Sequence, residues 1–397
     1  MKQPRLAQET GAEELFGRSI DELTAKQAIK TALEIQQQPR KWLELATALE
    51  RKADEIVAFL KEPFAQEDLL VVFAGAGSSA FAGGIIAAEV MASAHRSAAA
   101  IPTTHLVDNH QCYLAPNRPI LLVSLARSGD SPESVAATEI VDRHARKVWH
   151  VVLTCNARGR LARSASTPDR LCLIMPEGTN DAGFAMTSSF SSMVLAALAI
   201  FASADIAGGA HRIRGASELA RSLLARHRWI EELAEKRHGR VVYLGSGQLY
   251  PAAAECALKL LELTDGEMIA LGDSPLGFRH GPKTIIDKDT LVIGLANRSP
   301  HAQKYCRDML LEIHRDGNAE VVALTPETSN GLAAIATPPI GLSGADLTDG
   351  WLSVLHVMFG QLFGLFKSLH LGHTPDDPCP SGEVNRVVRS VTIYDPP

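Results

Sequence analysis

Residues 69–79 read LLVVFAGAGSS, and this stretch decides the fold class. It joins a short, continuous apolar run to a glycine-rich turn, and the helical pattern that follows extends to about Ala94. A strand that is apolar at every position is typical of a sheet covered on both faces. The stretch therefore predicts a strand, a turn and a helix of an α/β protein.

The same succession recurs along the chain. Further apolar runs predict strands at Ile120–Leu125, Val148–Thr154 and Leu171–Met175, and again at Arg240–Leu244, Leu291–Leu295 and Glu320–Leu324. Helical patterns lie between them, which favours a parallel sheet with helices on both faces. A weak repeat, GxGS at Gly75 and GSG at Gly245, falls at the same strand-to-helix corner. We therefore expect two similar doubly wound α/β halves.

The chain has 397 residues, more than one hydrophobic core usually supports. We expect an N-terminal helical extension at residues 1–62, a first α/β domain at 63–234 and a second at 235–397. In the extension, a helix from Ala25 is broken at Pro39, and a second helix covers Trp42–Leu60. Long helical regions are expected at Thr187–Lys236 and Thr348–Leu369.

Composition excludes several classes of protein. The chain is 46% hydrophobic and 21% charged, and its net charge of −6 comes without any block of Lys or Arg. It therefore lacks the basic stripe of a nucleic-acid binder. No signal-type segment and no run of eighteen apolar residues is present, so we expect a cytoplasmic protein with no membrane span. The six cysteines lack C-x-x-C spacing, which favours reduced thiols over disulfides or zinc.

Three turns of the first half are rich in Ser, Thr or Gly and precede helices. They lie at residues 75–79, 127–133 and 185–189. In such folds ligands bind beyond the carboxyl ends of the strands, and free N–H groups at helix starts suit an anion. Together the turns predict a phosphate site that needs no metal. For any single turn, helix capping by a residue such as Ser131 remains an equal alternative.

A dinucleotide cofactor is the main competitor for the first turn. However, Ala80 stands where the third glycine of G-x-G-x-x-G belongs, and no acidic residue follows the expected second strand. The P-loop pattern is also absent. We therefore expect no nucleotide cofactor.

Residues 245–263 read GSGQLYPAAAECALKLLEL, a helix that is apolar nearly all round and hence expected to be buried. Glu255, Lys259 and Glu262 are spaced i, i+4 and i+7, so they share one face of it. Buried charges are costly unless paired. The row is therefore either a structural ion network, which the spacing alone favours, or a set of catalytic groups.

Residues 274–283, SPLGFRHGPK, place His280 between glycine and proline residues. The histidine is thus expected on a rigid loop. A histidine of this kind is usually just solvated, but one that follows an ionisable helix in the same half is a candidate proton donor.

Several separate blocks carry a family resemblance: SPLGFRHGPK, GFAMTSS, PTTHLV and the tail GEVNRVVRSVTI. Over residues 65–397 the chain resembles tandem sugar isomerase (SIS) domain proteins, which have flavodoxin-like halves. It is most similar to the AgaS group, bacterial galactosamine-6-phosphate deaminase/isomerases also described as tagatose-6-phosphate ketose/aldose isomerases.

The resemblance implies a role for each matched residue. Glu262 matches the carboxylate that moves a proton between C1 and C2 of the sugar, Lys259 and Glu255 match its helix partners, and His280 matches the ring-opening histidine. The positions implied to bind the phosphate or the sugar are Gly77, Ser78, Ser79, Arg127, Ser128, Ser131, Thr187, Ser188 and Arg389. Arg127 and Arg389 replace a glutamine and a lysine of the related glucosamine-6-phosphate synthase.

The implied activity is conversion of galactosamine 6-phosphate to tagatose 6-phosphate and ammonia, without metal or cofactor. The segment before the first strand is too short for a glutaminase domain, so a catabolic direction is expected. A homodimer is the smallest assembly implied, because in the synthase the neighbouring subunit contributes the histidine. A plain aldose–ketose isomerase and a non-catalytic sugar-phosphate sensor remain alternatives.

Overall fold

The computed structural model describes residues 14–164, 167–325, 332, 335, 346–386 and 391–394. The chain forms two compact units, and each is built around one parallel sheet. Unit 1 consists of residues 1–39, 181–187 and 215–383, and unit 2 of residues 40–180, 188–214 and 384–397. The division into domains at residues 62 and 234 stays a prediction.

The sheet of unit 2 has five parallel strands in the order β4-β3-β5-β6-β7. They are β3 (Leu70–Ala74), β4 (Ala98–Ala100), β5 (Pro119–Ala126), β6 (Lys147–Thr154) and β7 (Arg170–Ile174). Numbered along the chain, the order is 2-1-3-4-5, which is flavodoxin-like. The chain reverses direction across the sheet between β3 and β5, so the crevice at their carboxyl ends is where such folds bind ligands.

Helices cover both faces of this sheet. On one face α7 (Thr103–Asn109) and α8 (Pro132–His144) pack on it, with Leu106 and Ile140 against Val72. On the other, Gly83 of α6 (Ser78–Ser93) lies against Phe73, which follows Val72 and points the opposite way. Helix α10 (Ser188–Phe201) packs against α6. The expected parallel sheet with two helical layers is confirmed.

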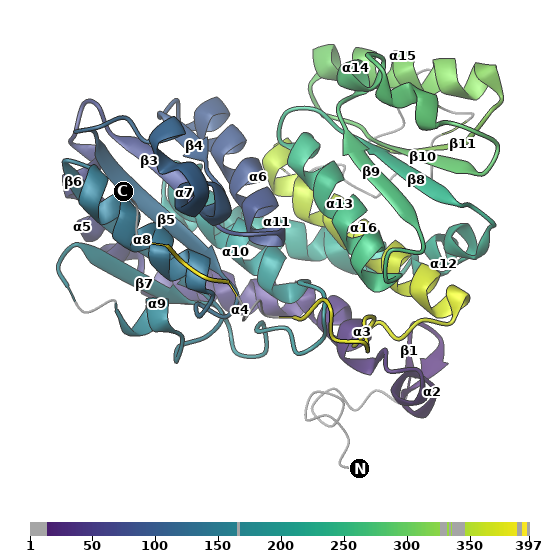
Figure 1. Ribbon diagram of the computed structural model, residues 1–397, viewed down its shortest axis with the longest axis horizontal. Helices are drawn as coiled ribbons and strands as arrows, with labels where there is room; N and C mark the ends of the chain where they lie inside the picture. The colour runs from purple at the N-terminus through teal and green to yellow at the C-terminus, as the bar shows by residue number, and fades with distance from the viewer. Residues whose placement is uncertain are drawn as a thin grey trace. The chain divides into compact units, whose positions relative to one another are not determined.

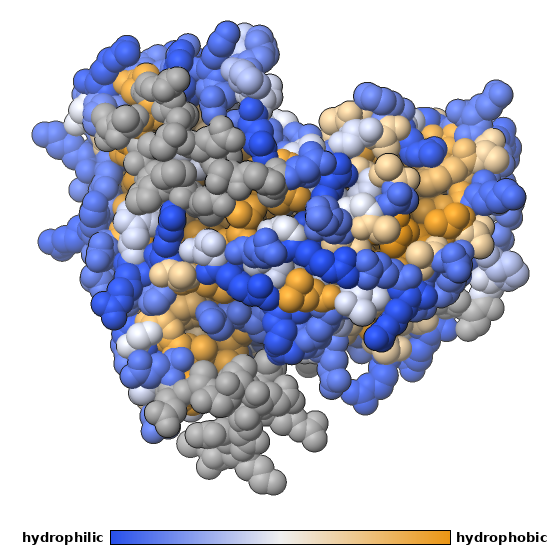
Figure 2. Space-filling model, turned by 180° about the vertical axis from the view of Figure 1, so that it is seen from behind, coloured by the Kyte–Doolittle hydropathy of each residue, from blue (hydrophilic) through white to orange (hydrophobic). Residues whose placement is uncertain are grey.

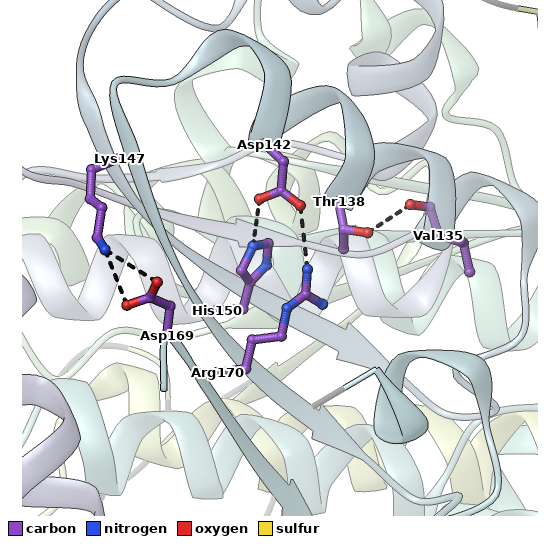
Figure 3. Close-up of polar contacts among 7 residues, drawn as sticks. All are labelled: Val135, Thr138, Asp142, Lys147, His150, Asp169 and Arg170. Carbon is purple, nitrogen blue, oxygen red and sulfur yellow. Dashed lines mark hydrogen bonds and ion pairs between the residues drawn. The ribbon is translucent and has the colours of Figure 1, made fainter. Parts of the chain in front are cut away.

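Asp142 ties α8 to two strands of the sheet (Figure 3). Its Oδ1 lies 2.7 Å from Nε2 of His150 on β6, and its Oδ2 accepts a hydrogen bond of 3.3 Å from Arg170 on β7. Lys147 and Asp169 pair beside them. These contacts at the end of α8 help to fix a helix whose first residues form one of the predicted phosphate turns.

The sheet of unit 1 repeats the same topology with one strand fewer, in the order β11-β10-β8-β9. Its strands are β8 (Arg240–Leu244), β9 (Ile269–Asp273), β10 (Thr290–Leu295) and β11 (Glu320–Leu324). Helices α14 (Pro275–Phe278) and α15 (Pro300–Asp316) lie on one side, and α13 (Leu249–Leu263) and α16 (Asp349–Leu371) on the other (Figure 1). The expected pair of similar halves is therefore present.

The remaining elements connect or flank the sheets. They are β1 (Glu14–Leu15), β2 (Arg18–Ser19), α2 (Ile20–Ala25), α3 (Ile29–Gln36), α4 (Gln38–Arg51), α5 (Ala53–Phe64), η1 (His110–Cys112), α9 (Arg160–Arg163), α11 (Ile206–Leu224), α12 (His227–Glu235) and η2 (Pro282–Ile285).

Three expectations about elements were wrong. Strands β4 and β9 were missed, because β4 is three alanines, which have little strand preference, and β9 ends in Gly-Asp. The helix expected at Trp42–Leu60 is two helices that meet at Lys52. The helical region expected at Thr187–Lys236 is present and is divided into three helices, the second of which begins after Asp205, whose carboxyl accepts a 2.6 Å hydrogen bond from the amide of Gly208.

Among the described residues, α16 is the one helix long and apolar enough to cross a membrane. The whole of its apolar window is buried inside the protein, as expected for a core helix. It packs along α13, which carries the predicted acid–base row.

Unit 2 also has an apolar groove of about 430 Å³. It is lined by residues of α5, by the segments that follow α6 and α10, and by the start of α11. Arg96 lies over the ring of Phe64 at 3.8 Å, and Val57 beside it is exposed. Figure 2 shows apolar residues gathered on the face of this unit that the view presents.

Candidate active site

The turn after β3 is built to bring the chain sharply into α6. Gly77 has φ 55°, in the left-handed region that favours glycine, and the helix begins at the next residue. Ser78 and Ser79 occupy its first two positions and are buried, each 4% exposed. Their hydroxyls lie at the N-terminus of α6, which follows the carboxyl end of β3. This arrangement suits an anion.

The turn after β5 lies next to it in the sheet order and holds the second set of hydroxyls. Ser131 is the N-cap of α8, since its hydroxyl accepts a hydrogen bond from the amide of Ser134 and donates to the hydroxyl of Ser134 at 2.7 Å. Ser128 contacts the amide of Asp130 at 3.3 Å. Ser131 therefore caps α8, as the capping alternative predicted. The N-terminus of α8 follows the carboxyl end of β5 in the chain.

Arg127 begins the same turn and is nearly buried, at 8% exposed. Its guanidinium donates a 2.5 Å hydrogen bond to the carbonyl of Arg386 in the C-terminal tail, and Arg386 contacts Asn180 at 3.3 Å. Both residues belong to unit 2. The tail is thus attached to the predicted phosphate turn by a cationic side chain, which the sequence did not reveal.

At the equivalent place in unit 1, beyond the carboxyl ends of β8 and β10, side chains of the chain form hydrogen bonds with one another. Ser246 donates to Asn297 at 2.7 Å, and Asn297 donates to Asp349 at 3.0 Å. The amide of Arg298 also donates to Asp349, at 2.7 Å. The two sheets share a topology, but the carboxylate of Asp349 at this place in unit 1 disfavours an anion.

Thr187 and Ser188 are both fully buried. The amide and the hydroxyl of Thr187 each donate a 2.9 Å hydrogen bond to Asp181. Ser188 begins α10. The contribution of both residues to phosphate binding stays a prediction.

The predicted acid–base row lies on α13 of unit 1. Lys259 and Glu255 are fully buried, and the Lys259 ammonium lies 3.4 Å from Oε1 of Glu255. On its other side Lys259 contacts Oε2 of Glu262, whose side chain is 24% exposed. The three side chains share one face of the helix, as their spacing predicted. The row therefore runs from a buried carboxylate, through a buried ammonium group, to a carboxylate that is partly exposed to solvent.

Helix α13 also packs closely against α16. A Cβ added to Gly360 of α16 would lie 2.7 Å from the sulfur of Cys256 on α13, so the two helices approach to a distance that only glycine allows. Lys259 and Glu255 are themselves fully buried, so the electrostatic interaction between them is stronger than at the surface.

His280 lies on a loop that is fixed on both sides. The loop starts at Ser274, which caps the short helix α14 by accepting from Gly277 at 3.0 Å. Arg279 contacts Glu312 of α15, and Lys283 contacts Glu312 at 2.6 Å. His280 itself is exposed between them. The expected rigid loop is present, and it presents the imidazole to the surface of the chain.

Comparison with known proteins gives the chain its family. The model of the SIS domain matches residues 64–203 and 232–339. A curated relative from Escherichia coli O157:H7, D-galactosamine-6-phosphate deaminase AgaS, is 40% identical over 374 residues, which cover 92% of this chain and 95% of the relative. The chain belongs to the SIS domain family, in its AgaS group.

Two further relatives agree with this assignment. The D-galactosamine-6-phosphate deaminase AgaS of Shewanella is 37% identical over 384 residues. The aligned residues cover 95% of this chain and 94% of the relative. The crystal structure of tagatose-6-phosphate ketose/aldose isomerase from Escherichia coli is 37% identical, has a TM-score of 0.84, and covers 92% of this chain and 96% of that one. The resemblance seen in the sequence is thus confirmed.

The SIS match divides the predicted site residues between its two segments. The first segment contains both turns of unit 2, and the second contains the row on α13 and the His280 loop. Arg389 lies outside the described residues, so its role stays a prediction. Among the described residues, no three or more of His, Cys, Asp and Glu are grouped so as to hold a metal ion.

Sequence reasoning missed three carboxyl groups of unit 1 that accept hydrogen bonds from backbone amides: Glu34, Asp181 and Asp376. Glu34 and Asp181 are buried, and Asp376 is partly buried. The hydrogen bonds of Glu34 and Asp376 join segments that are far apart in the sequence: Asp376 accepts from the amide of Lys30, 346 residues away. Sequence spacing therefore could not reveal these two. The only local hint was the pair Asp181 and Gly183 in front of the third turn.

Proposed function

We propose that this SIS protein is a hexosamine 6-phosphate deaminase/isomerase that converts galactosamine 6-phosphate to tagatose 6-phosphate and ammonia. The observation that carries the proposal is the row on α13. Lys259 forms a fully buried ion pair with Glu255, while Glu262, the other carboxylate that Lys259 contacts, is partly exposed. A purely structural ion network has no need of an accessible end, whereas proton transfer to a substrate does.

The proposed chemistry begins with ring opening, in which His280 exchanges a proton with the ring oxygen and O1. Glu262 then removes the proton from C2, and O1 takes up a proton, which gives an enaminol. Return of a proton to C1 leaves an iminium group at C2. Water adds there, the C2–N bond breaks, and ammonia leaves with the proton that balances the step. Lys259 stabilises negative charge that develops on oxygen during these transfers.

Substrate binding is proposed to rest on the hydroxyl-rich turns of unit 2. Two helices, α6 and α8, begin at the carboxyl ends of neighbouring strands, and their N-termini favour a dianionic phosphate. Ser78, Ser79, Ser128 and Ser131 add donors, and Arg127 adds positive charge. Hydrogen bonds to charged groups of this kind contribute roughly 1.5–3 kcal/mol each.

The test is incubation of the pure protein with galactosamine 6-phosphate. We expect ammonia and tagatose 6-phosphate to form in equal amounts. Exchange between neutral aldose and ketose phosphates without any ammonia would refute deamination and leave a plain isomerase. Binding without turnover of either kind would leave the sensor.

A cytoplasmic homodimer or larger homo-oligomer is also proposed. The exposed position of His280 supports it, because a histidine at the surface of one chain is available to a neighbouring one. If His280 acts across subunits, a mixture of Glu262→Gln and His280→Ala proteins forms heterodimers with one intact site. Random mixing of dimers should restore about a quarter of the activity, whereas no recovery would place Glu262 and His280 of one site on the same chain.

A further inference from the structure

Glu34 of α3 is a buried carboxyl, 5% exposed, that holds a segment far away in the sequence. Its Oε1 accepts hydrogen bonds from the amides of Ala182 at 2.5 Å and of Gly183 at 3.1 Å, and its Oε2 accepts from Gly183 at 3.3 Å. A Cβ on Gly183 would lie 3.0 Å from Oε2. The backbone of residues 182 and 183 is therefore in close contact with the carboxyl.

Asp181 closes the same segment on itself. Its two carboxyl oxygens accept the amide and the hydroxyl of Thr187, each at 2.9 Å, and both residues are fully buried. Residues 181–187 thus form a short loop with its first and last residues joined. Glu34, which is not part of this loop, accepts hydrogen bonds from its second and third residues, Ala182 and Gly183.

Helix α3 is itself fixed at its N-terminus by Asp376. Ala28, the N-cap residue, has no side-chain hydrogen bond. Asp376 takes over that task, because its carboxyl accepts the amides of Lys30 at 3.0 Å and Thr31 at 2.8 Å, and the hydroxyl of Thr31 at 2.8 Å. Glu34 therefore projects from a helix that is anchored within unit 1.

We propose that Glu34 is a positioning residue of the sugar-phosphate site, whose carboxyl sets the conformation of residues 181–187 and thereby the place of Thr187. The inference rests on the proposed function and on the prediction from the sequence that Thr187 and the following Ser188 bind the substrate. Glu34 does not touch the sugar; it acts through the backbone that it holds.

The cost of this arrangement argues against a role in stability alone. Burial, with added repulsion from Asp181 and Asp376, raises the pKa of Glu34 well above its usual range, although the bonds from Ala182 and Gly183 oppose the rise. A neutral side chain would bridge the same amides with less penalty. Ionisable groups whose pKa values are strongly shifted cluster at functional sites.

The experiment compares four variants in the full chain. Glu34→Gln keeps an oxygen that accepts from Ala182 and Gly183, whereas Glu34→Ala removes both bonds. Gly183→Ala leaves Glu34 in place but inserts a Cβ between the loop and the carboxyl. Ser217→Ala is the matched control, because it removes a buried 2.7 Å hydrogen bond of unit 1, to the carbonyl of Pro39, without touching the loop.

The readouts are KM and kcat for galactosamine 6-phosphate, sugar-phosphate affinity by calorimetry, and hydrogen exchange of residues 181–187. We expect Glu34→Ala and Gly183→Ala to raise KM at least about tenfold with a smaller change in kcat, since misplacement by about 1 Å is enough for effects of that size. Glu34→Gln should restore KM to within about threefold of the wild type, and Ser217→Ala should leave it unchanged.

Two results would overturn the inference. One is an unchanged KM in Glu34→Ala and Gly183→Ala while stability falls, and the other is an equal rise in KM for Ser217→Ala. If the wild type binds the sugar but releases no ammonia, deamination fails, and the affinities still decide the role of Glu34. If the wild type binds no sugar, hydrogen exchange still tests the role of Glu34. Unchanged hydrogen exchange of residues 181–187 in Glu34→Ala would refute control of the loop by Glu34.

Discussion

Replacement of Lys259 by methionine tests whether the charge of Lys259 stabilises the folded protein by compensating the buried carboxylate of Glu255. In the structure the ammonium lies 3.4 Å from Oε1 of Glu255, and both side chains are fully buried. Methionine has nearly the same length and fits the apolar surroundings, so Lys259→Met removes the charge with little change in volume.

The expected loss follows from the burial of Glu255. Removing one partner of a buried pair leaves the other charge uncompensated and costs about 3–5 kcal/mol. The contact with Glu262 adds little, because that carboxylate is 24% exposed and screened by solvent. A loss of this size is a large share of the roughly 5–15 kcal/mol that stabilise a typical domain.

The assay is urea unfolding followed by circular dichroism, with the double variant Lys259→Met/Glu255→Gln as the control. The double variant has no buried charge at either position, so it should recover most of the loss. A single variant as stable as the wild type would contradict the burial of the pair. A double variant no more stable than the single one would show that the loss comes from packing and not from charge.

Three further predictions follow from other contacts. Gly360→Val should destabilise the protein by about 1–3 kcal/mol in thermal unfolding, because its Cβ meets Cys256. Ser131→Ala should cost about 1 kcal/mol through loss of the α8 cap and also weaken sugar-phosphate binding by calorimetry. In a pH series of urea unfolding, the wild type should lose stability relative to Glu34→Gln as pH rises from 4.5 towards the raised pKa of Glu34, since the folded state holds that proton more tightly.

Each of these has a contrary result. A Gly360→Val protein with an unchanged melting temperature would refute the close approach of α13 and α16. A Ser131→Ala protein that loses stability but keeps its affinity would leave the serine as a cap alone. Parallel pH profiles for the wild type and Glu34→Gln would show that the carboxyl does not titrate differently on folding.

The elements that the sequence predicted well carry their signal locally. Continuous apolar runs such as Leu70–Ala74 identified seven of the nine strands of the two parallel sheets. A strand that is buried on both faces is apolar at every position, so its own residues are enough to predict it. The charged row on α13 was equally visible, since Glu255, Lys259 and Glu262 follow the helical period within one element.

The features that sequence reasoning missed depend on contacts between distant segments. Glu34 meets Ala182 across 148 residues, and Arg127 meets Arg386 across 259. In a single sequence neither pair differs from ordinary surface residues. Strand β4, three alanines long, exists because it pairs with β3, and its own residues have no preference for that conformation.

The measurement that bears most directly on the proposed reaction is a comparison of turnover and binding in Glu262→Gln. Glutamine keeps the shape of the side chain but neither gives nor takes the proton. We expect ammonia release to fall at least about 100-fold, the lower end of what general acid–base groups contribute, while calorimetric affinity for galactosamine 6-phosphate stays within a few-fold of the wild type. Ammonia release at the wild-type rate would contradict the assignment of proton transfer to Glu262.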